Sequence, residues 1–117
     1  MIFVVDDDEI MAECIARATK RETQIFHNAI EAMSALEDGL PELIFLDILL
    51  DGPDGFTFLN ELMSYQDTAK IPVVIVTSLD INIEKMLDYG VVGIIKKENM
   101  LPSEIKKYSN EYCKSEA

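Results

Sequence analysis

The sequence alternates short apolar runs with amphipathic segments five times, and this alternation constrains the fold more than any other feature. The apolar runs that predict strands lie at residues 2–5, 24–27, 43–46, 72–76 and 93–95. The segments that predict helices lie at residues 9–20, 29–36, 56–63, 83–89 and 102–113. Strands that are apolar on both faces and alternate with helices form a parallel sheet covered on each side. With right-handed crossovers, we expect an α/β, doubly wound (βα)₅ fold.

Helical spacing also predicts which side chains the first two helices bury. Apolar residues recur at intervals of three and four positions, as in an amphipathic helix. The side chains predicted to face the core are Ile10, Met11, Cys14, Ile15 and Ala18 in the first helix and Ile30, Met33 and Leu36 in the second.

Length and charge narrow the classes of function. The 117 residues, of which 49% are apolar, suit one domain over residues 1–117 without linkers. Ten basic against 22 acidic side chains give a net charge of −12, which argues against direct binding to nucleic acid or to an anionic membrane. Cys14 and Cys113 are too few for a disulfide framework. No stretch is typical of a signal peptide or a membrane span, so we expect a cytoplasmic protein.

Polar residues follow four of the five predicted strands. In open parallel sheets, ligands bind at the carboxyl ends of the strands, so these residues are the candidate site. They are Asp6, Asp7 and Asp8 after the first strand, Asp47 after the third, Thr77 and Ser78 after the fourth, and Lys96 and Lys97 after the fifth.

Clustered carboxylates indicate a bound cation, because several of them cannot ionise together without one. Oxygen ligands without His or Cys favour Mg²⁺, which completes its coordination with water and phosphate oxygens. A lysine and a hydroxyl group beside that ion suit phosphoryl transfer, and an aspartate there can form an aspartyl phosphate. We expect Asp8 and Glu9 to cap and begin the first helix rather than bind metal.

The sequence resembles the receiver domain of two-component response regulators. The matching segments are Val4-Val5-Asp6-Asp7, Leu46-Asp47 followed by Asp54-Gly55, Pro72-Val73 to Thr77-Ser78, and Gly90 to Lys97. They cover nearly the whole chain in the order of the family. The resemblance implies a CheY-like (flavodoxin-like) fold with strand order 2-1-3-4-5.

The resemblance also implies a role for each site residue. Asp47 would accept a phosphoryl group from a histidine kinase or a histidine phosphotransfer protein. Asp6, Asp7 and Asp47, with the backbone carbonyl of Leu49, would hold Mg²⁺. Thr77 would be the switch hydroxyl, and Ser78 the small neighbour that leaves access. Lys97 would bind a phosphoryl oxygen, with Lys96 as the alternative, since strand alternation directs only one of them to the site.

Three positions depart from the family pattern. Glu98 stands where a proline usually follows the lysine, and loss of that rigid turn is expected to loosen the lysine. Ile94 replaces the usual aromatic switch residue. Asp51 occupies the position of another usual proline, and Pro53 lies two residues later. We expect no enzyme activity beyond self-phosphorylation and autodephosphorylation, no effector domain in these 117 residues, and output through a downstream protein or a missing effector domain.

Two other functions remain open at this point. A pseudo-receiver would keep the fold as a binding module without the phosphorylation switch. A phosphatase of the haloacid dehalogenase type would use Asp6 as nucleophile and Asp8 as general acid, since Asp6-Asp7-Asp8-Glu9-Ile10 is similar to the first motif of that family. The short chain and the unexplained Asp47 argue against the phosphatase.

Overall fold

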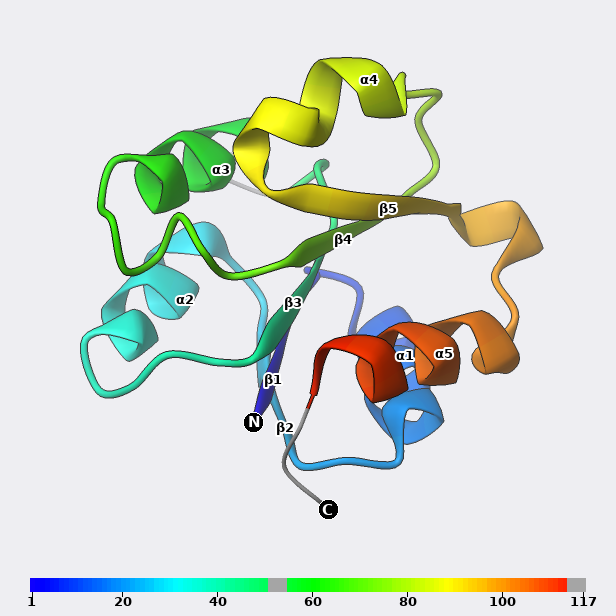
Figure 1. The fold of residues 1–117 in the computed structure, drawn as a ribbon. Helices are drawn as coiled ribbons and strands as arrows, with labels where there is room; N and C mark the ends of the chain where they lie inside the picture. Colours follow the sequence, from blue (N-terminus) through cyan, green and yellow to red (C-terminus); the bar gives the residue numbers. More distant parts are fainter. Residues whose placement is uncertain (51–54, 114–117) are drawn as a thin grey trace.

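A five-stranded parallel sheet forms the centre of the computed structural model, which describes residues 1–50 and 55–113 (Figure 1). The sheet order is β2-β1-β3-β4-β5, which confirms the predicted doubly wound fold. The strands are β1 (Ile2–Val5), β2 (Thr23–Phe26), β3 (Leu43–Leu46), β4 (Val73–Thr77) and β5 (Val91–Lys96).

Helices cover both faces of this sheet. The α-helices are α1 (Glu9–Thr19), α2 (Ala29–Leu36), α3 (Gly55–Met63), α4 (Ile83–Met86) and α5 (Pro102–Tyr112). Short 3₁₀ turns, η1 (Leu87–Tyr89) and η2 (Lys97–Asn99), follow α4 and β5. Helices α1 and α5 pack together on one face, whereas α2, α3 and α4 lie on the other (Figure 1).

The strands supply two apolar cores because successive side chains point to opposite faces. In β1, Phe3 and Val5 pack toward α2 and α3, whereas Ile2 and Val4 pack toward α1 and α5. All four residues of β1 are buried. Such double-sided burial explains why the central strands read as continuous apolar runs.

The predicted inner face of α1 is wrong in part. Ile15 is buried as expected, but Ile10 is 77% exposed and Cys14 is also exposed. The buried stripe runs instead through Ala12, Ile15 and Thr19. Intervals of three and four residues fit either side of a short helix, and the small Ala12 is the residue that fits against the sheet.

The predicted inner face of α2 is wrong at one position. Ile30 is exposed, whereas Ala29, Ala32 and Leu36 are buried. Alanine carries little apolar signal in a sequence, yet it allows a helix to approach a sheet closely. Leu36 is buried as predicted and Met33 packs against the core partly buried, so the prediction is wrong only at Ile30.

The fourth helix and the fifth strand differ from the prediction in their boundaries. The expected helix over residues 83–89 is one turn of α-helix followed by a 3₁₀ turn, which ends at Gly90 with a left-handed φ of 75°. Strand β5 begins two residues earlier than predicted and ends at Lys96. Among the helices of the described ranges, none has the length and apolar character needed to cross a membrane.

Candidate functional site

Neighbouring strands bring three of the predicted carboxylates together. Strands β1 and β3 pair with Val5 opposite Leu46, so the next residues, Asp6 and Asp47, emerge side by side at the carboxyl edge. One carboxylate oxygen from each of Asp6, Asp7 and Asp47 lies within 4.8 Å of the others. Asp6 is 1% and Asp47 5% exposed. The structure thus assembles the predicted acidic cluster.

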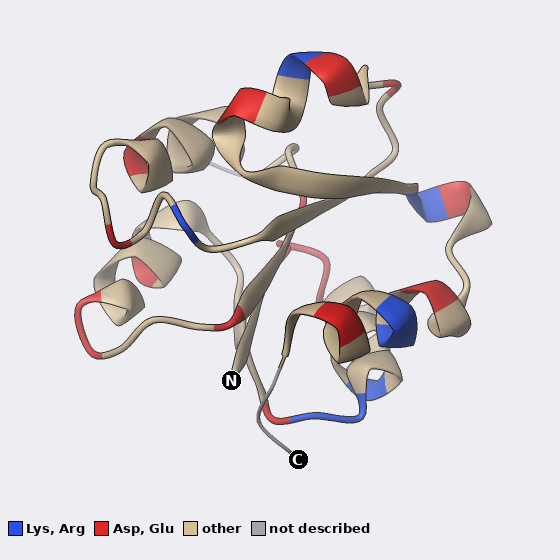
Figure 2. Cartoon of the chain, in the orientation of Figure 1, with Lys and Arg blue, Asp and Glu red and all other residues tan. Residues whose placement is uncertain are grey.

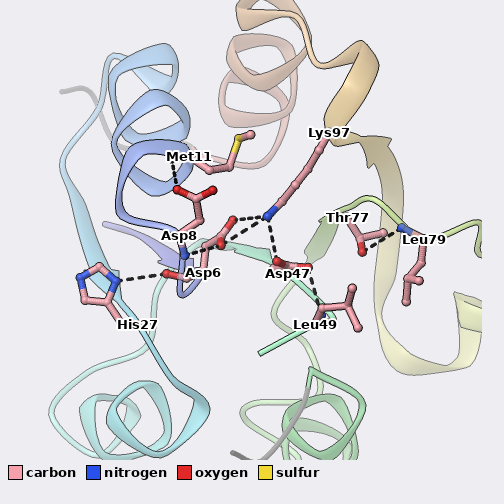
Figure 3. Close-up of polar contacts among 9 residues, drawn as sticks. All are labelled: Asp6, Asp8, Met11, His27, Asp47, Leu49, Thr77, Leu79 and Lys97. Carbon is pink, nitrogen blue, oxygen red and sulfur yellow. Dashed lines mark hydrogen bonds and ion pairs between the residues drawn. The ribbon is translucent and has the colours of Figure 1, made fainter. Parts of the chain in front are cut away.

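The two candidate lysines point to different places. Lys97 Nζ lies 2.8 Å from Asp47 Oδ2 and 3.1 Å from Asp6 Oδ2 (Figure 3). Lys96 Nζ instead contacts the carboxylates of Asp80, at 2.5 Å, and Glu98, at 3.7 Å. Of the two, the geometry favours Lys97 as the site lysine.

The turn after β5 keeps Lys97 in place without the usual proline. Residues Lys97–Asn99 form the 3₁₀ turn η2, and the described residues contain no cis peptide bond. The Glu98 carboxylate lies near Lys96 rather than in the site. Lys97 contacts both acids without that proline, and the expected loosening of the lysine stays a prediction. Ile94, at the aromatic position, is half-buried and packs against the α2–α4 core.

Burial and the neighbouring groups together shift the pKa values of Asp6 and Lys97. Burial raises the pKa of Asp6 above its usual 3.8, and the nearby Asp47 charge adds to this, although bonds from Asp8 and Lys97 oppose it. Burial would lower the pKa of Lys97, but its bonds to Asp47 and Asp6 and their charges outweigh it, so its pKa is raised above 10.5. The Lys97 ammonium group contacts two of the three clustered carboxylates, which leaves the cluster with an excess of negative charge that suits an added cation.

Backbone groups fix the acidic side chains from the other side. The Leu49 N–H donates to Asp47 Oδ1 at 3.0 Å, so Lys97 and this amide hold different oxygens of the same carboxylate. The Asp8 N–H donates to Asp6 Oδ1 at 2.9 Å. Both carboxylates are therefore oriented before any ligand arrives.

Asp8 has a structural role at the start of α1. Its Oδ1 accepts a hydrogen bond from the Met11 N–H at 3.1 Å, which confirms the predicted N-cap. Figure 3 shows this carboxylate turned toward the helix, away from Asp47 and Lys97. The general acid that the phosphatase alternative requires is therefore occupied as a helix cap.

The predicted hydroxyl residues lie at the end of β4, the strand beside β3. Thr77 is fully buried, and its Oγ1 accepts a hydrogen bond from the Leu79 N–H at 3.3 Å. Figure 3 shows Thr77 on the β4 side of Asp47. Ser78 is exposed. Their switch and access roles stay predictions.

Part of the predicted motif after Asp47 lies outside the described residues. This applies to Asp51, Pro53 and Asp54. Gly55 is described and starts α3, where its N–H donates to the Ile48 carbonyl at 2.9 Å. A Cβ on Gly55 would lie 2.5 Å from Ile48 Cα and 2.8 Å from the Asp47 carbonyl oxygen. Glycine therefore allows α3 to pack directly on the Asp47 loop.

The donor set fits a hard divalent cation. All three side chains offer carboxylate oxygens, the ligands that Mg²⁺ and Mn²⁺ prefer. Within the described part of the chain, the buried Asp6 Oδ2 accepts no hydrogen bond, although Lys97 Nζ lies 3.1 Å from it. The Leu49 backbone carbonyl as a further ligand stays a prediction.

Comparison with known proteins decides the family. The family model of the response regulator receiver domain matches residues 2–108. The chain belongs to this family. The response regulator PleD of Caulobacter vibrioides is 35% identical over 82 residues, which are 68% of this chain and 18% of that protein. MprA of Mycobacterium avium is 27% identical over 101 residues, 82% of this chain and 43% of that protein. The receiver domain thus spans less than half the length of these relatives.

Solved structures of receiver domains share the fold over nearly all of the chain. The receiver domain of NtrX from Brucella abortus has a TM-score of 0.83 and 27% identity, covering 99% of this chain and 100% of that one. The phosphorylated cyanobacterial phytochrome response regulator RcpA has a TM-score of 0.81 and 25% identity, covering 99% and 95%. These likenesses confirm the CheY-like architecture of this receiver domain.

Sequence reasoning missed two contacts at the edge of the site. Asp80, three residues after Thr77, pairs with Lys96; its position after a predicted strand was the available signal. His27 Nδ1 lies 3.2 Å from the Asp6 carbonyl oxygen (Figure 3). The His27 contact depends on the pairing of β1 with β2, which the sequence alone does not place in register.

Proposed function

We propose that this receiver domain accepts a phosphoryl group on Asp47 from a histidine kinase or a histidine phosphotransfer protein. The observation that carries the proposal is the contact between Lys97 Nζ and Asp47 Oδ2 at 2.8 Å, inside a cluster of three carboxylates. A nearly buried carboxylate with a fixed ammonium group beside it suits attack on phosphorus, because the ammonium group can stabilise the negative charge on the phosphoryl oxygens during transfer.

Mg²⁺ is the metal that best suits this proposal. Asp6, Asp7 and Asp47, with the Leu49 carbonyl, would hold it. When bound, the ion neutralises charge on the phosphoryl oxygens. Support comes from the oxygen-only donor set and from the buried Asp6 Oδ2, which accepts no hydrogen bond among the described residues.

The transfer forms one bond and breaks one. A carboxylate oxygen of Asp47 bonds to phosphorus as the phosphorus–nitrogen bond of the donor phosphohistidine breaks, and the imidazole leaves with the electron pair. Lys97 then exchanges its contact with Asp47 for a phosphoryl oxygen. The Thr77 hydroxyl donates to another phosphoryl oxygen. RcpA, which is 25% identical, has been crystallised in phosphorylated form, and this supports the proposal.

The domain carries out only its own phosphorylation and dephosphorylation under this proposal. Its signal passes through protein contact, either to a downstream protein or to an attached effector domain. The curated relatives support a receiver domain that signals to a separate part of a longer protein, because the matched region is 18% of PleD and 43% of MprA.

Labelling with acetyl phosphate and Mg²⁺ tests the acceptor. Intact-mass spectrometry should show one added phosphoryl group, which Asp47→Asn abolishes and the exposed control Asp38→Asn retains. Full labelling of Asp47→Asn would refute the assignment. Label on Asp6, with rapid turnover of p-nitrophenyl phosphate, would support the phosphatase. No labelling of the parent protein with acetyl phosphate or with a phosphohistidine donor would support the pseudo-receiver.

A further inference from the structure

A groove lies between α2 and α3, away from the phosphorylation site. Its apolar lining comes from Met33 and Leu36 of α2, Leu62 of α3, and Leu40 and Tyr65 in the loops that follow these helices. Its volume is about 480 Å³. Leu40 is 45% and Tyr65 59% exposed, so large apolar surfaces stand open to solvent. Such patches mark binding surfaces more often than isolated exposed residues do.

The groove opens at the edge of the sheet opposite Asp47. Helices α2 and α3 start near the carboxyl ends of the strands and run back toward the opposite edge (Figure 1). The residues that line the groove lie where both helices end. A ligand there would not contact Asp6, Asp47 or Lys97. Its binding is therefore expected to be independent of phosphorylation.

The rim of the groove is acidic. Glu37, Glu61 and Asp67 line it, and the described lining residues include no Lys or Arg. Figure 2 shows acidic residues on both loops at this end of the molecule. Lys70 is a basic residue of the segment that precedes β4. Lys70 does not line the groove. An apolar floor with an acidic rim is complementary to a ligand with an apolar face and flanking positive charges.

We propose that this groove binds a basic amphipathic segment of another protein. Such a segment would place apolar side chains, spaced as on one face of a helix, against the partly buried Met33 and the exposed Leu40 and Tyr65. Its Lys or Arg residues would meet Glu37, Glu61 and Asp67. A second copy of this chain is a poor occupant, because its own net charge of −12 would repel the rim.

A synthetic peptide provides the probe. It is a fluorescein-labelled helical peptide with Leu at positions i, i+4 and i+7 and Lys on the flanks, and its binding is followed by fluorescence anisotropy. The double variant Glu37→Lys/Glu61→Lys should weaken binding about 10-fold or more, which corresponds to about 1.4 kcal/mol. The control Glu22→Lys/Glu84→Lys has the same net charge on other surfaces and should bind as the parent does.

Two further measurements distinguish binding in the groove from non-specific electrostatic attraction between the basic peptide and the acidic protein. Leu40→Ser/Tyr65→Ser leaves the charge unchanged and should also weaken binding. Amide shifts on peptide addition should map to α2 and α3, and Asp47→Asn should bind normally. Equal weakening by both charge-reversal variants, or shifts centred elsewhere, would overturn the proposal. A concentration-dependent dimer in sedimentation that Glu37→Lys/Glu61→Lys dissociates would also overturn it, in favour of self-association.

Discussion

Lys97 Nζ and Asp47 Oδ2 lie 2.8 Å apart although their strands, β5 and β3, are separated by β4 in the sheet. The same ammonium group is 3.1 Å from Asp6 Oδ2, which follows β1. One lysine therefore joins the carboxyl ends of three strands. It also balances part of the repulsion between two nearly buried carboxylates.

Removing this ammonium group should destabilise the metal-free protein. Lys97→Met leaves Asp6 and Asp47 facing each other without a cation, and we expect the free energy of unfolding to fall by about 1–3 kcal/mol. Urea denaturation in EDTA measures it. Lys96→Met is the matched control and should have no measurable effect, because its partner Asp80 is exposed. A larger loss in Lys96→Met than in Lys97→Met would contradict this assignment.

Mg²⁺ should stabilise the folded protein. A ligand that binds only the folded state at about 100 times its Kd adds about 2.7 kcal/mol to the free energy of unfolding. Asp7→Asn should raise the stability of the metal-free protein, because it removes one repelling charge, and should weaken the response to Mg²⁺. Thermal unfolding with millimolar Mg²⁺ and with EDTA checks both. A melting temperature of the parent that ignores Mg²⁺ would exclude a metal site.

Because of Asp6, the free energy of unfolding of the metal-free protein should fall as pH rises. Its pKa is raised above 3.8 in the folded state by burial, so folding favours the protonated form. This contribution is fully present below about pH 3.8 and is lost as pH rises through the raised pKa. Asp6→Asn removes this contribution of Asp6 to the pH dependence of stability. The free energy of unfolding of Asp6→Asn relative to the parent should therefore increase with pH, as measured by urea denaturation in EDTA. A gain that is constant with pH would refute this cause.

Two glycines should respond differently to alanine. A Cβ at Gly55 would clash with backbone atoms of Ile48 and Asp47, which cannot move freely, so Gly55→Ala should cost about 3 kcal/mol in urea denaturation. At Gly93 the clash is with the hydroxyl end of Tyr108, which can turn toward solvent, and the cost should be about 1 kcal/mol. Adding Tyr108→Ser should relieve the Gly93 cost but not the Gly55 cost. Equal costs at both positions would contradict this distinction.

The sequence predicted the parts of this protein that depend on local pattern. The five βα repeats and the Asp8 cap follow from hydropathy and capping residues, and the gathering of Asp6, Asp7 and Asp47 follows from their places after buried strands. The inner face of α1 could not be predicted, because packing against the sheet favours Ala12 over the larger Ile10. The family resemblance favoured Lys97 over Lys96, and the turn after β5 supplies the different contacts of the two lysines.

We expect slow hydrolysis of the aspartyl phosphate, because two leucine side chains lie beside the site. The Leu49 N–H donates to Asp47 and the Leu79 N–H donates to Thr77. The side chains of Leu49 and Leu79 are 52% and 38% exposed. Figure 3 shows them beside Asp47 and Thr77. Each therefore stands next to a residue that would contact the phosphoryl group, and neither side chain has a polar atom to orient an attacking water.

Leu49→Asn/Leu79→Glu should speed hydrolysis of the aspartyl phosphate about 10-fold, or about 1.4 kcal/mol in barrier, because polar side chains there can position water. The measurement is the decay of the phosphorylated mass after removal of acetyl phosphate. Leu87→Asn, at an exposed leucine of η1, is the control and should decay at the parent rate. If the double variant decays no faster than the parent, the two leucines pack away from the path of the water and do not set the lifetime.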